Sequence, residues 1–220
     1  MEAFKGAIFD MDGTLIDSLM FWDLLWDAFG KEFAGGKEFR PAKQDDKAVR
    51  TMTLECAMDF LHTTYHIGKN GDELLEFTVN MIEDFYSNTV KTKPGVTEFL
   101  ETCHKNGVKM CVASATATDL VKIALKHCGI DKYFSAVLSC ADIGNGKDHP
   151  DIYLAALEHL GTEKEETVVF EDSALAIETA CKAGFSAVGI YDRFNYGQDT
   201  IKKLADVYID KDETLMKCFK

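Results

Sequence analysis

The sequence predicts an α/β fold, in which a doubly wound, Rossmann-like parallel sheet forms the core and an all-helical cap domain is inserted into it. Three observations support this prediction. A short apolar run near the N-terminus, Lys5–Phe9, ends abruptly at Asp10. From Gly95 onward, short apolar segments alternate with segments of helical periodicity. Between these regions lies a long stretch with helical spacing and no convincing strand.

The expected elements of the core follow in chain order. Lys5–Phe9 has the continuous apolar character of a buried parallel strand. The later strands should span residues 108–113, 134–138, 167–170, 187–190 and 207–209. The helices between them should span residues 96–106, 117–128, 151–160 and 174–183, each followed by a glycine, as is typical of helix ends. Strands joined in this way run parallel, so ligands should bind outside their carboxyl ends.

The stretch between Thr14 and Lys93 is too long for a plain loop. Mostly apolar residues recur there at helical spacing in three groups: Phe21, Trp22, Leu25 and Phe29; Val49, Met52, Cys56 and Phe60; and Leu75, Thr78, Ile82 and Phe85. We therefore expect a core of residues 1–14 and 94–220 and a helical cap domain of residues 15–93, joined through hinges near Asp17 and Thr92.

The composition is that of an ordinary globular protein, with 46% hydrophobic and 28% charged residues. The formal net charge of −13 argues against nucleic acid as the main partner, because binding to phosphate backbones needs a basic surface. No apolar run approaches the roughly 20 residues that a membrane-spanning helix needs, so we expect no membrane partner. An anionic substrate would need a metal ion or well-placed cations in this acidic chain.

Cysteine usage indicates a reducing compartment. The seven cysteines are odd in number and scattered, and none forms a CxxC pair, which argues against a zinc site or a thiol redox motif. The first residues lead directly into a strand pattern, without the pattern of a signal peptide. We therefore expect a cytoplasmic protein. The sequence does not settle the oligomeric state, and we favour a monomer.

The strongest chemical signal is the sequence Asp-Met-Asp-Gly-Thr at positions 10–14, directly after the first strand. Asp10 is placed to attack a phosphorus atom and to become an acyl phosphate. Asp12, two residues on, is placed to protonate the leaving oxygen and later to activate water. Gly13 permits the tight turn that would bring both carboxylates to one ligand. A solvated turn is the alternative interpretation, since Asp and Gly both favour turns.

Extended by Leu15, this segment resembles the first motif of the haloacid dehalogenase superfamily. Three further matches follow in the order of that family, so the resemblance covers the whole chain. The chain resembles the branch that contains beta-phosphoglucomutase and phosphoglycolate phosphatase, in which a helical cap is inserted into the core. The resemblance implies a phosphoric monoester hydrolase with Mg²⁺ as its cofactor and a small-molecule phosphate ester as its substrate.

The second match is Ser114, after the strand expected at residues 108–113. Its hydroxyl group, together with the backbone N–H groups of Ala115 and Thr116 at a helix start, would form a phosphate cradle. Alternatively, Ser114 and Thr116 only cap the helix, because Thr116 and Asp119 resemble a capping box.

The third match is Lys147, in the segment Gly-Lys-Asp-His-Pro-Asp-Ile-Tyr at positions 146–153. The family pattern is Gly-Lys-Pro-x-Pro-Asp-x-Tyr, so Asp148 replaces the first proline, which should loosen the loop but keep the cation. Lys147 would neutralise the nucleophile and the phosphoryl oxygens. A solvated surface charge is the alternative for Lys147, and we expect His149 to be a loop residue rather than a base.

The fourth match is Glu-Asp-Ser at positions 171–173, after the strand expected at residues 167–170. Two adjacent acids at a strand end are costly unless a cation joins them, and Mg²⁺ prefers hard oxygen ligands. By resemblance, Asp10, Glu171, Asp172 and the backbone carbonyl of Asp12 would form the metal shell, with Glu171 bound directly or through water. The alternative is that both acids only start the next helix, where they favour its dipole.

Together the motifs favour a Mg²⁺-dependent phosphatase that acts on a small, sugar-phosphate-like metabolite through an aspartyl-phosphate intermediate on Asp10. A phosphosugar mutase of the beta-phosphoglucomutase type is the first alternative, although Trp22 stands where that mutase has a cap His and Ser18 where it has a hinge Thr. A haloacid dehalogenase is disfavoured because the position of Asp12 is not acidic in those enzymes. A non-catalytic binding protein is disfavoured because the charged residues of the motifs are intact.

Substrate choice should lie in the cap, where Arg50 and Trp22 are the candidate contacts. Arg50, on the second expected cap helix, would reach a second anionic group of the substrate, or it would be a solvated charge on the helix surface. Trp22 and Trp26, with Phe21 and Phe29, would line a ligand pocket or form simple core, as an aromatic stripe at helical spacing usually does.

Overall fold

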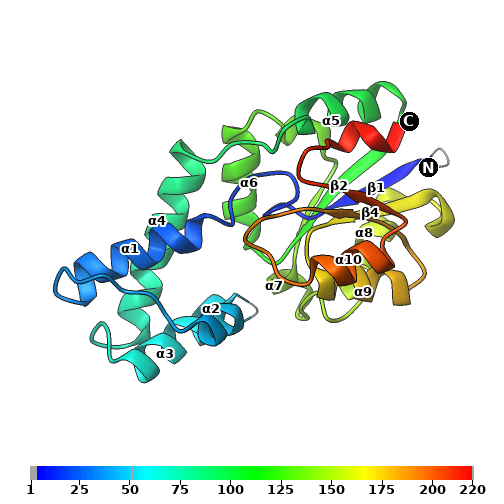
Figure 1. The fold of residues 1–220 in the computed structure, drawn as a ribbon. Coiled ribbons are helices and arrows are strands. Elements are labelled where there is room, and N and C mark those ends of the chain that lie inside the picture. Colours follow the sequence, from blue (N-terminus) through cyan, green and yellow to red (C-terminus); the bar gives the residue numbers. More distant parts are fainter. Residues whose placement is uncertain (1–3, 51, 220) are drawn as a thin grey trace. The chain divides into compact units, whose positions relative to one another are not determined.

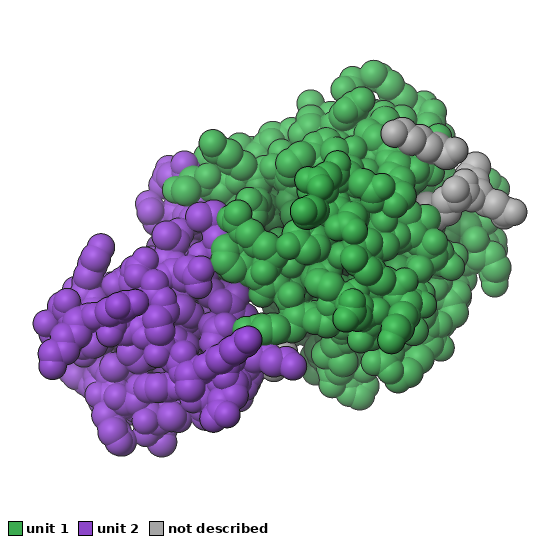
Figure 2. Space-filling view, viewed as in Figure 1, with its two compact units in different colours: residues 1–19, 89–220 green, residues 20–88 purple. Residues whose placement is uncertain are grey.

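The computed structural model describes residues 4–50 and 52–219, and the chain divides into two compact units. One unit, Met1–Leu19 together with Thr89–Lys220, contains the β-sheet and is called the sheet unit. The other, Met20–Asn88, is built from helices and is called the helical unit. Figure 2 shows the two units in different colours. The helical unit interrupts the sheet unit in the sequence.

A parallel sheet forms the centre of the sheet unit (Figure 1). Its strands lie in the order β3-β2-β1-β4-β5-β6, and every neighbouring pair is parallel. The strands are β1 Gly6–Phe9, β2 Lys109–Ser114, β3 Val137–Ser139, β4 Thr167–Glu171, β5 Ser186–Ile190 and β6 Val207–Ile209. This is the strand order of a doubly wound sheet, so the predicted α/β, Rossmann-like fold is confirmed.

Helices cover both faces of the sheet. Successive side chains of each strand point to opposite faces, and in these strands both sets are apolar and must be buried. On one face, Ile8 of β1 shares a buried cluster with residues of α8 Asp151–Leu160 and α9 Ala174–Lys182. On the other face, Phe9 packs against α5 Val96–Lys105. The remaining helical elements of this unit are α6 Thr118–His127, α7 Cys140–Ile143, α10 Gln198–Leu204 and the 3-10 turns η1 Asp131–Tyr133, η2 Lys164–Glu166 and η3 Leu215–Phe219.

The face under α5 is built mainly from phenylalanine rings. Phe99 of α5 is fully buried, and its ring centroid lies 6.2 Å from that of Phe9 and 5.4 Å from that of Phe170. Phe9 and Phe170, on the neighbouring strands β1 and β4, are stacked with their centroids 4.5 Å apart. Because both residues lie near the carboxyl ends of their strands, this packing also fixes the acidic residues that follow.

The direction in which the chain winds changes between β1 and β4. The sheet grows from β1 to β2 and β3 on one side, and β4, β5 and β6 lie on the other. In sheets of this kind, ligands bind at such a switch point, outside the carboxyl ends of the strands. Asp10 directly follows β1, Glu171 is the last residue of β4 and Asp172 comes next, so the fold brings these three acids to the switch point.

The helical unit consists of α1 Phe21–Phe33, α2 Lys43–Val49, α3 Leu54–Tyr65 and α4 Gly71–Asn88. The aromatic stripe predicted on α1 is mostly core, because Phe21, Trp26 and Phe29 are buried, whereas Trp22 is partly exposed. Within the described ranges of either unit, no helix is both long enough and apolar enough to cross a lipid bilayer.

The prediction of one helical stretch through Val49, Met52, Cys56 and Phe60 is wrong. α2 ends at Val49 and α3 begins only at Leu54. The hydroxyl group of Thr53 accepts a hydrogen bond from the backbone N–H of Cys56 at 3.3 Å, which caps a new helix at this point. Met52 lies in the intervening bend and is 38% exposed, so it is not part of an apolar helix face.

A second difference concerns the strand predicted at residues 134–138. The observed strand β3 is shorter and shifted, and the helix α7, which was not expected, follows it at once. The hydroxyl group of Ser139 accepts a hydrogen bond from the backbone N–H of Ala141 at 3.2 Å. This contact is a helix N-cap, and it ends the strand at the last residue of β3.

The two segments that join the units lie side by side within the sheet unit. Ile16 and Thr92 form an antiparallel bridge, and the backbone N–H of Asp17 donates to the carbonyl of Lys91 at 2.9 Å. The backbone N–H of Lys93 donates to the carbonyl of Leu15, also at 2.9 Å. The chain therefore leaves the sheet unit and returns to it through one paired strip of backbone.

Replacing Phe99 with alanine should lower the free energy of unfolding by about 3–5 kcal/mol, because it empties a fully buried position. Urea unfolding followed by circular dichroism measures this change. Leu154→Ala is the matched control, since Leu154 is 43% exposed on α8 and its truncation should cost about 0.5 kcal/mol or less. A Phe99→Ala protein as stable as the wild type would contradict the phenylalanine core described above.

Candidate active site

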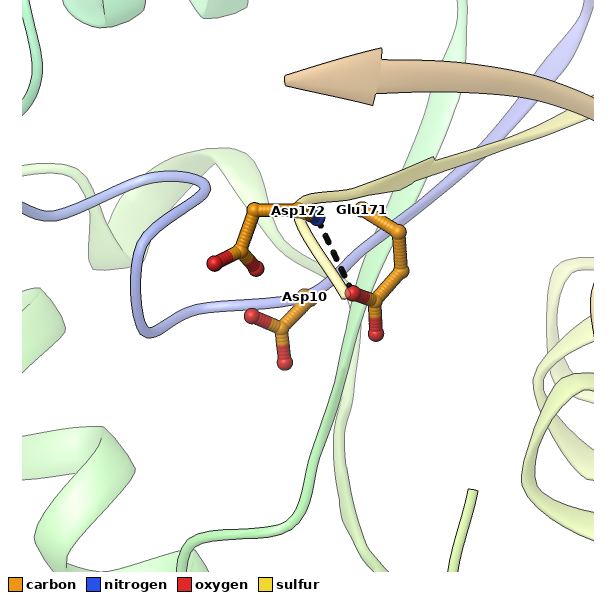
Figure 3. Close-up of side chains that lie close together, drawn as sticks. All are labelled: Asp10, Glu171 and Asp172. Carbon is orange, nitrogen blue, oxygen red and sulfur yellow. Dashed lines mark hydrogen bonds between the residues drawn. The ribbon is translucent and has the colours of Figure 1, made fainter. Parts of the chain in front are cut away.

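Three carboxylates meet at the switch point of the sheet. Asp10, Glu171 and Asp172 are all buried, and each contributes an oxygen that lies within 4.8 Å of the others. Figure 3 shows their carboxylates gathered at the ends of the two strands that carry them. We call these residues the carboxylate cluster. The sequence motifs at positions 10 and 171–172 are thus brought together across more than half of the chain.

The turn after β1 is shaped by Gly13, whose φ of +81° lies in the left-handed region. Its backbone N–H donates to the carbonyl of Ile16 at 3.0 Å, which closes the turn. A Cβ atom at this position would overlap the carboxylate of Asp172. Glycine is therefore required twice, by the backbone conformation and by the close approach of the cluster.

Lys147 connects the two halves of the cluster. Its side chain is 10% exposed, and its ammonium group donates to Asp10 and, at 2.6 Å, to Oε1 of Glu171. The loop that carries it begins after α7, and its next residues, Asp148 and His149, are more than half exposed. The replacement of the family's proline by Asp148 therefore leaves the cation at the site and places the added charge in solvent.

The charges in the cluster are not balanced by Lys147 alone. Burial raises the pKa of Asp10 well above its ordinary value, and the charges of Glu171 and Asp172 add to this effect while Lys147 opposes it. Burial, together with the charge of Glu171, raises the pKa of Asp172 to about 7. Burial lowers the pKa of Lys147, but Asp10 and Glu171 outweigh it and hold this pKa well above the ordinary value. The site therefore has an excess of negative charge that a further cation would relieve.

The oxygens of the cluster are of the type that hard divalent cations prefer, and their burial and charge fit such an ion. Glu171 is already engaged, because its Oε2 accepts hydrogen bonds from the backbone N–H groups of Asp172 and Ser173, both at 3.0 Å. Asp172 accepts from the hydroxyl group of Thr14 at 3.2 Å. With Asn195 at its other oxygen, Asp172 accepts one hydrogen bond at each oxygen, whereas Glu171 accepts two at Oε2 and Lys147 at Oε1, so Asp172 keeps more acceptor capacity for a cation.

The side chain of Asp12 lies outside the carboxylate cluster. Its Oδ1 accepts a hydrogen bond from the hydroxyl group of Ser18 at 2.6 Å, and its Oδ2 accepts one from the hydroxyl group of Thr116 at 2.8 Å. Asp12 is half-buried, unlike the acids of the cluster. Its carboxylate is therefore held separately, and a metal contact through its backbone carbonyl remains a prediction.

Ser114 is the last residue of β2, which is the strand next to β1, and it is buried. Its hydroxyl oxygen accepts a hydrogen bond from the backbone N–H of Thr116 at 3.1 Å. The helix expected at residues 117–128 is observed as α6 Thr118–His127, but its N-cap is Ala117 and it has no side-chain cap. Thr116 is thus not a capping residue here; its hydroxyl group binds Asp12 instead.

The structure adds polar residues that the sequence motifs do not contain. The side-chain amide of Asn195 donates to Oδ2 of Asp172 at 2.8 Å. Lys93 forms a buried ion pair with Asp192 at 2.8 Å, with side chains that are 15% and 2% exposed. Asp192 and Asn195 follow β5, and polar residues after a strand end are candidates for the site, so the sequence could have indicated them. Lys93 lies in the linker, and its position in the sequence does not indicate a role in the site.

Arg50 and Trp22, the residues predicted to contact the substrate, are neighbours in the helical unit. The guanidinium carbon of Arg50 lies 5.6 Å from the centroid of the Trp22 ring. Arg50 follows α2 and donates two hydrogen bonds to the carboxylate of Asp46, both at 3.0 Å. Its Nη1 atom is buried and has no hydrogen-bond partner among the residues that the structure describes. Arg50 is therefore not a solvated surface charge.

Comparisons with known proteins agree with this architecture. The profile of a family described as haloacid dehalogenase-like hydrolase matches residues 7–190. A phosphorylated carbohydrates phosphatase from Thermotoga maritima is 28% identical, over 96% of both chains. A phosphoglycolate phosphatase from Salmonella typhimurium is 31% identical, over 98% of this chain and 92% of its own.

A solved structure also matches over nearly the whole length. A candidate beta-phosphoglucomutase from Thermotoga maritima superposes with a TM-score of 0.78 at 25% identity, covering 94% of each chain. The match therefore includes the doubly wound sheet and the helical insertion. With the family profile spanning β1 to β5 and relatives aligned end to end, the chain belongs to the haloacid dehalogenase-like hydrolase family.

Proposed function

We propose that the protein is a Mg²⁺-dependent phosphatase that hydrolyses a small, sugar-phosphate-like metabolite through an aspartyl-phosphate intermediate on Asp10. The observation that carries the proposal is the carboxylate of Asp10, which lies at the switch point beside two further acids and in contact with Lys147. The relatives that are named phosphatases of phosphorylated carbohydrates and of phosphoglycolate support the class of substrate. All seven cysteines are free thiols, which supports a cytoplasmic location.

Asp10, Asp172 and the backbone carbonyl of Asp12 would hold the metal. Glu171 would contact it through water, because Lys147 and two backbone N–H groups already occupy its oxygens. A bound Mg²⁺ ion offsets the negative charge of the carboxylates and of the phosphoryl oxygens. This charge compensation also answers how so acidic a chain could accept an anionic substrate.

The first half of the reaction transfers the phosphoryl group to the protein. A carboxylate oxygen of Asp10 attacks phosphorus, and the bond from phosphorus to the ester oxygen breaks. Asp12 gives its proton to the departing alcohol. The ammonium group of Lys147 offsets charge on the nucleophile and on the phosphoryl oxygens. Ser114 and the backbone N–H of Ala115 bind the phosphoryl oxygens in this proposal.

The second half releases phosphate. Asp12, now ionised, takes a proton from water, and the water oxygen attacks phosphorus so that the bond from phosphorus to Asp10 breaks. The hydroxyl groups of Ser18 and Thr116 orient the carboxylate of Asp12 through both of its oxygens, so the same group can serve as acid and then as base. Two carboxylates with different partners thus take different roles.

We assign the choice of leaving group to the helical unit. Asp46 occupies Nε and Nη2 of Arg50, so Nη1 is the donor that remains. Because Nη1 is buried, a side-chain movement would have to expose it to an anionic group of the substrate. Trp22 lies beside this guanidinium and offers a ring face for a sugar.

Asp10→Asn should lower kcat by on the order of a million-fold, because the amide cannot form the phosphoenzyme. A phosphate-release assay over a panel of phosphorylated metabolites measures the loss. Circular dichroism should show an unchanged fold. Asp119→Asn, at an exposed position on α6, is the control and should keep full activity. Substantial phosphatase activity in Asp10→Asn would refute the assignment of the nucleophile.

A chelator should reduce the activity to background, and added Mg²⁺ should restore it, since the cluster carries more negative charge than Lys147 can balance. The same panel of phosphate esters, with and without chelator, gives the readout. Phosphate release that persists after exhaustive chelation would contradict the proposed metal requirement. A panel in which no ester is turned over would instead favour a binding protein that keeps the fold.

A phosphosugar mutase is the second candidate, because a structure described as a candidate beta-phosphoglucomutase matches the chain. Trp22 weighs against this candidate, because the resemblance to beta-phosphoglucomutase places a cap histidine at this position. We therefore expect a hexose monophosphate, supplied with a small amount of sugar bisphosphate, to release inorganic phosphate without isomerisation. Isomerised sugar phosphate without net phosphate release, detected by NMR, would favour the mutase.

A further inference from the structure

Lys93 is an anchor between the linker and the site. Its ammonium group donates to the carbonyl of Gly13 at 2.5 Å, to the carbonyl of Tyr191 at 2.9 Å and to Oδ2 of Asp192 at 2.8 Å. An ammonium group has three protons, so these acceptors use all of its donors. Lys93 thereby ties the turn after β1 to the loop after β5.

Asp192 shapes the loop that follows β5. Its Oδ2 receives Lys93, and its Oδ1 accepts a hydrogen bond from the backbone N–H of Phe194 at 2.9 Å. Its carbonyl accepts a hydrogen bond from the backbone N–H of Asn195 at 3.3 Å. Because the side chain of Asp192 is almost fully buried, its ion pair with Lys93 is needed to compensate for the loss of water around it. The position of Asn195 is therefore set by this ion pair.

Asn195 transmits the position of that loop to the carboxylate cluster. Its side-chain amide donates to the backbone carbonyl of Asp172 at 2.7 Å and to Oδ2 of the same residue at 2.8 Å. Thr14 donates to the other carboxylate oxygen of Asp172 at 3.2 Å. The carboxylate is thus held at both oxygens, and one of these contacts depends on Lys93 and Asp192.

We propose that Lys93, Asp192 and Asn195 are positioning residues that fix the carboxylate of Asp172 for binding the divalent cation. The inference rests on the proposed metal role of Asp172, and it adds residues outside the four sequence motifs. Partners that orient a ligating carboxylate in this way affect metal affinity rather than substrate affinity. The hydrogen bonds of this network lead to the carboxylate of Asp172 itself, so they act on the proposed metal ligand and not only on the fold.

The first test is Asn195→Ala. The Mg²⁺ concentration for half-maximal activity should rise by about 10- to 100-fold, whereas KM for the substrate at saturating Mg²⁺ should change by less than about threefold. A second readout needs no turnover: the Mg²⁺ concentration that gives half of the metal-induced rise in unfolding temperature should increase in parallel. Asn88→Ala is the matched control, since Asn88 bonds Asp84 on α4 of the helical unit and should leave both values unchanged.

The second test separates positioning from stability. Lys93→Met should lower the unfolding temperature and raise the Mg²⁺ requirement, because it leaves Asp192 buried without its cation. Adding Asp192→Asn should recover the unfolding temperature, since the unpaired charge is gone and the amide oxygen can still accept from Phe194. The Mg²⁺ requirement of the double variant should stay raised. Lys109→Met, which loses a bond to the carbonyl of Leu160 at the opposite end of β2, is the control.

The outcomes separate the proposed Mg²⁺-dependent function from the positioning role of Lys93, Asp192 and Asn195. A wild-type protein that shows neither activation nor thermal stabilisation by Mg²⁺ would overturn the proposed function, and the positioning role with it. A Mg²⁺-dependent wild type whose Asn195→Ala variant has an unchanged Mg²⁺ requirement would overturn the positioning role alone. If Lys93→Met does not fold, the Asn195→Ala measurements decide the question. Recovery of both stability and Mg²⁺ requirement in the double variant would show a purely structural ion pair.

Discussion

The mutual repulsion of three buried carboxylates is the constraint on which the rest of the sheet unit depends. β1 and β4 are paired neighbours, so their carboxyl ends bring Asp10, Glu171 and Asp172 to one place. Burial makes unbalanced charge expensive, and the surrounding chain is arranged to contain it. The Lys147 loop brings an ammonium group, the Gly13 turn makes room for Asp172, and the loop after β5 supplies an amide.

Much of the sheet unit could be predicted, because its strands are apolar on both faces and its helices end at glycines. The elements that escaped prediction are set by single side-chain caps rather than by periodicity. Thr53 caps the start of α3, although the apolar spacing predicted one helix that continued across this position. Ser139 caps the start of α7 directly after β3. Such local hydrogen bonds compete with the regular pattern and leave only a weak trace in the sequence.

The candidate site shows the same division. The acids were predictable because a strand-end position, repeated in several motifs, implies one shared edge of the sheet. Thr116 looked like a capping residue in sequence, yet its hydroxyl group binds Asp12 from far along the chain. Lys93 and Asn195 are isolated polar residues whose partners are fixed only by tertiary structure. The pairing of Arg50 with Asp46, by contrast, follows from their spacing of four residues near one helix.

The paired linkers have a consequence for how such a protein can diversify. Since Ile16 and Thr92 lie opposite each other, the two ends of the inserted segment emerge at one point of the sheet unit. An insertion whose ends are adjacent can be lengthened, exchanged or rebuilt without moving the strands on either side of it. The strand ends and the inserted helical unit can then change by separate mutational routes. One catalytic framework can in this way be inherited intact while new metabolites are explored.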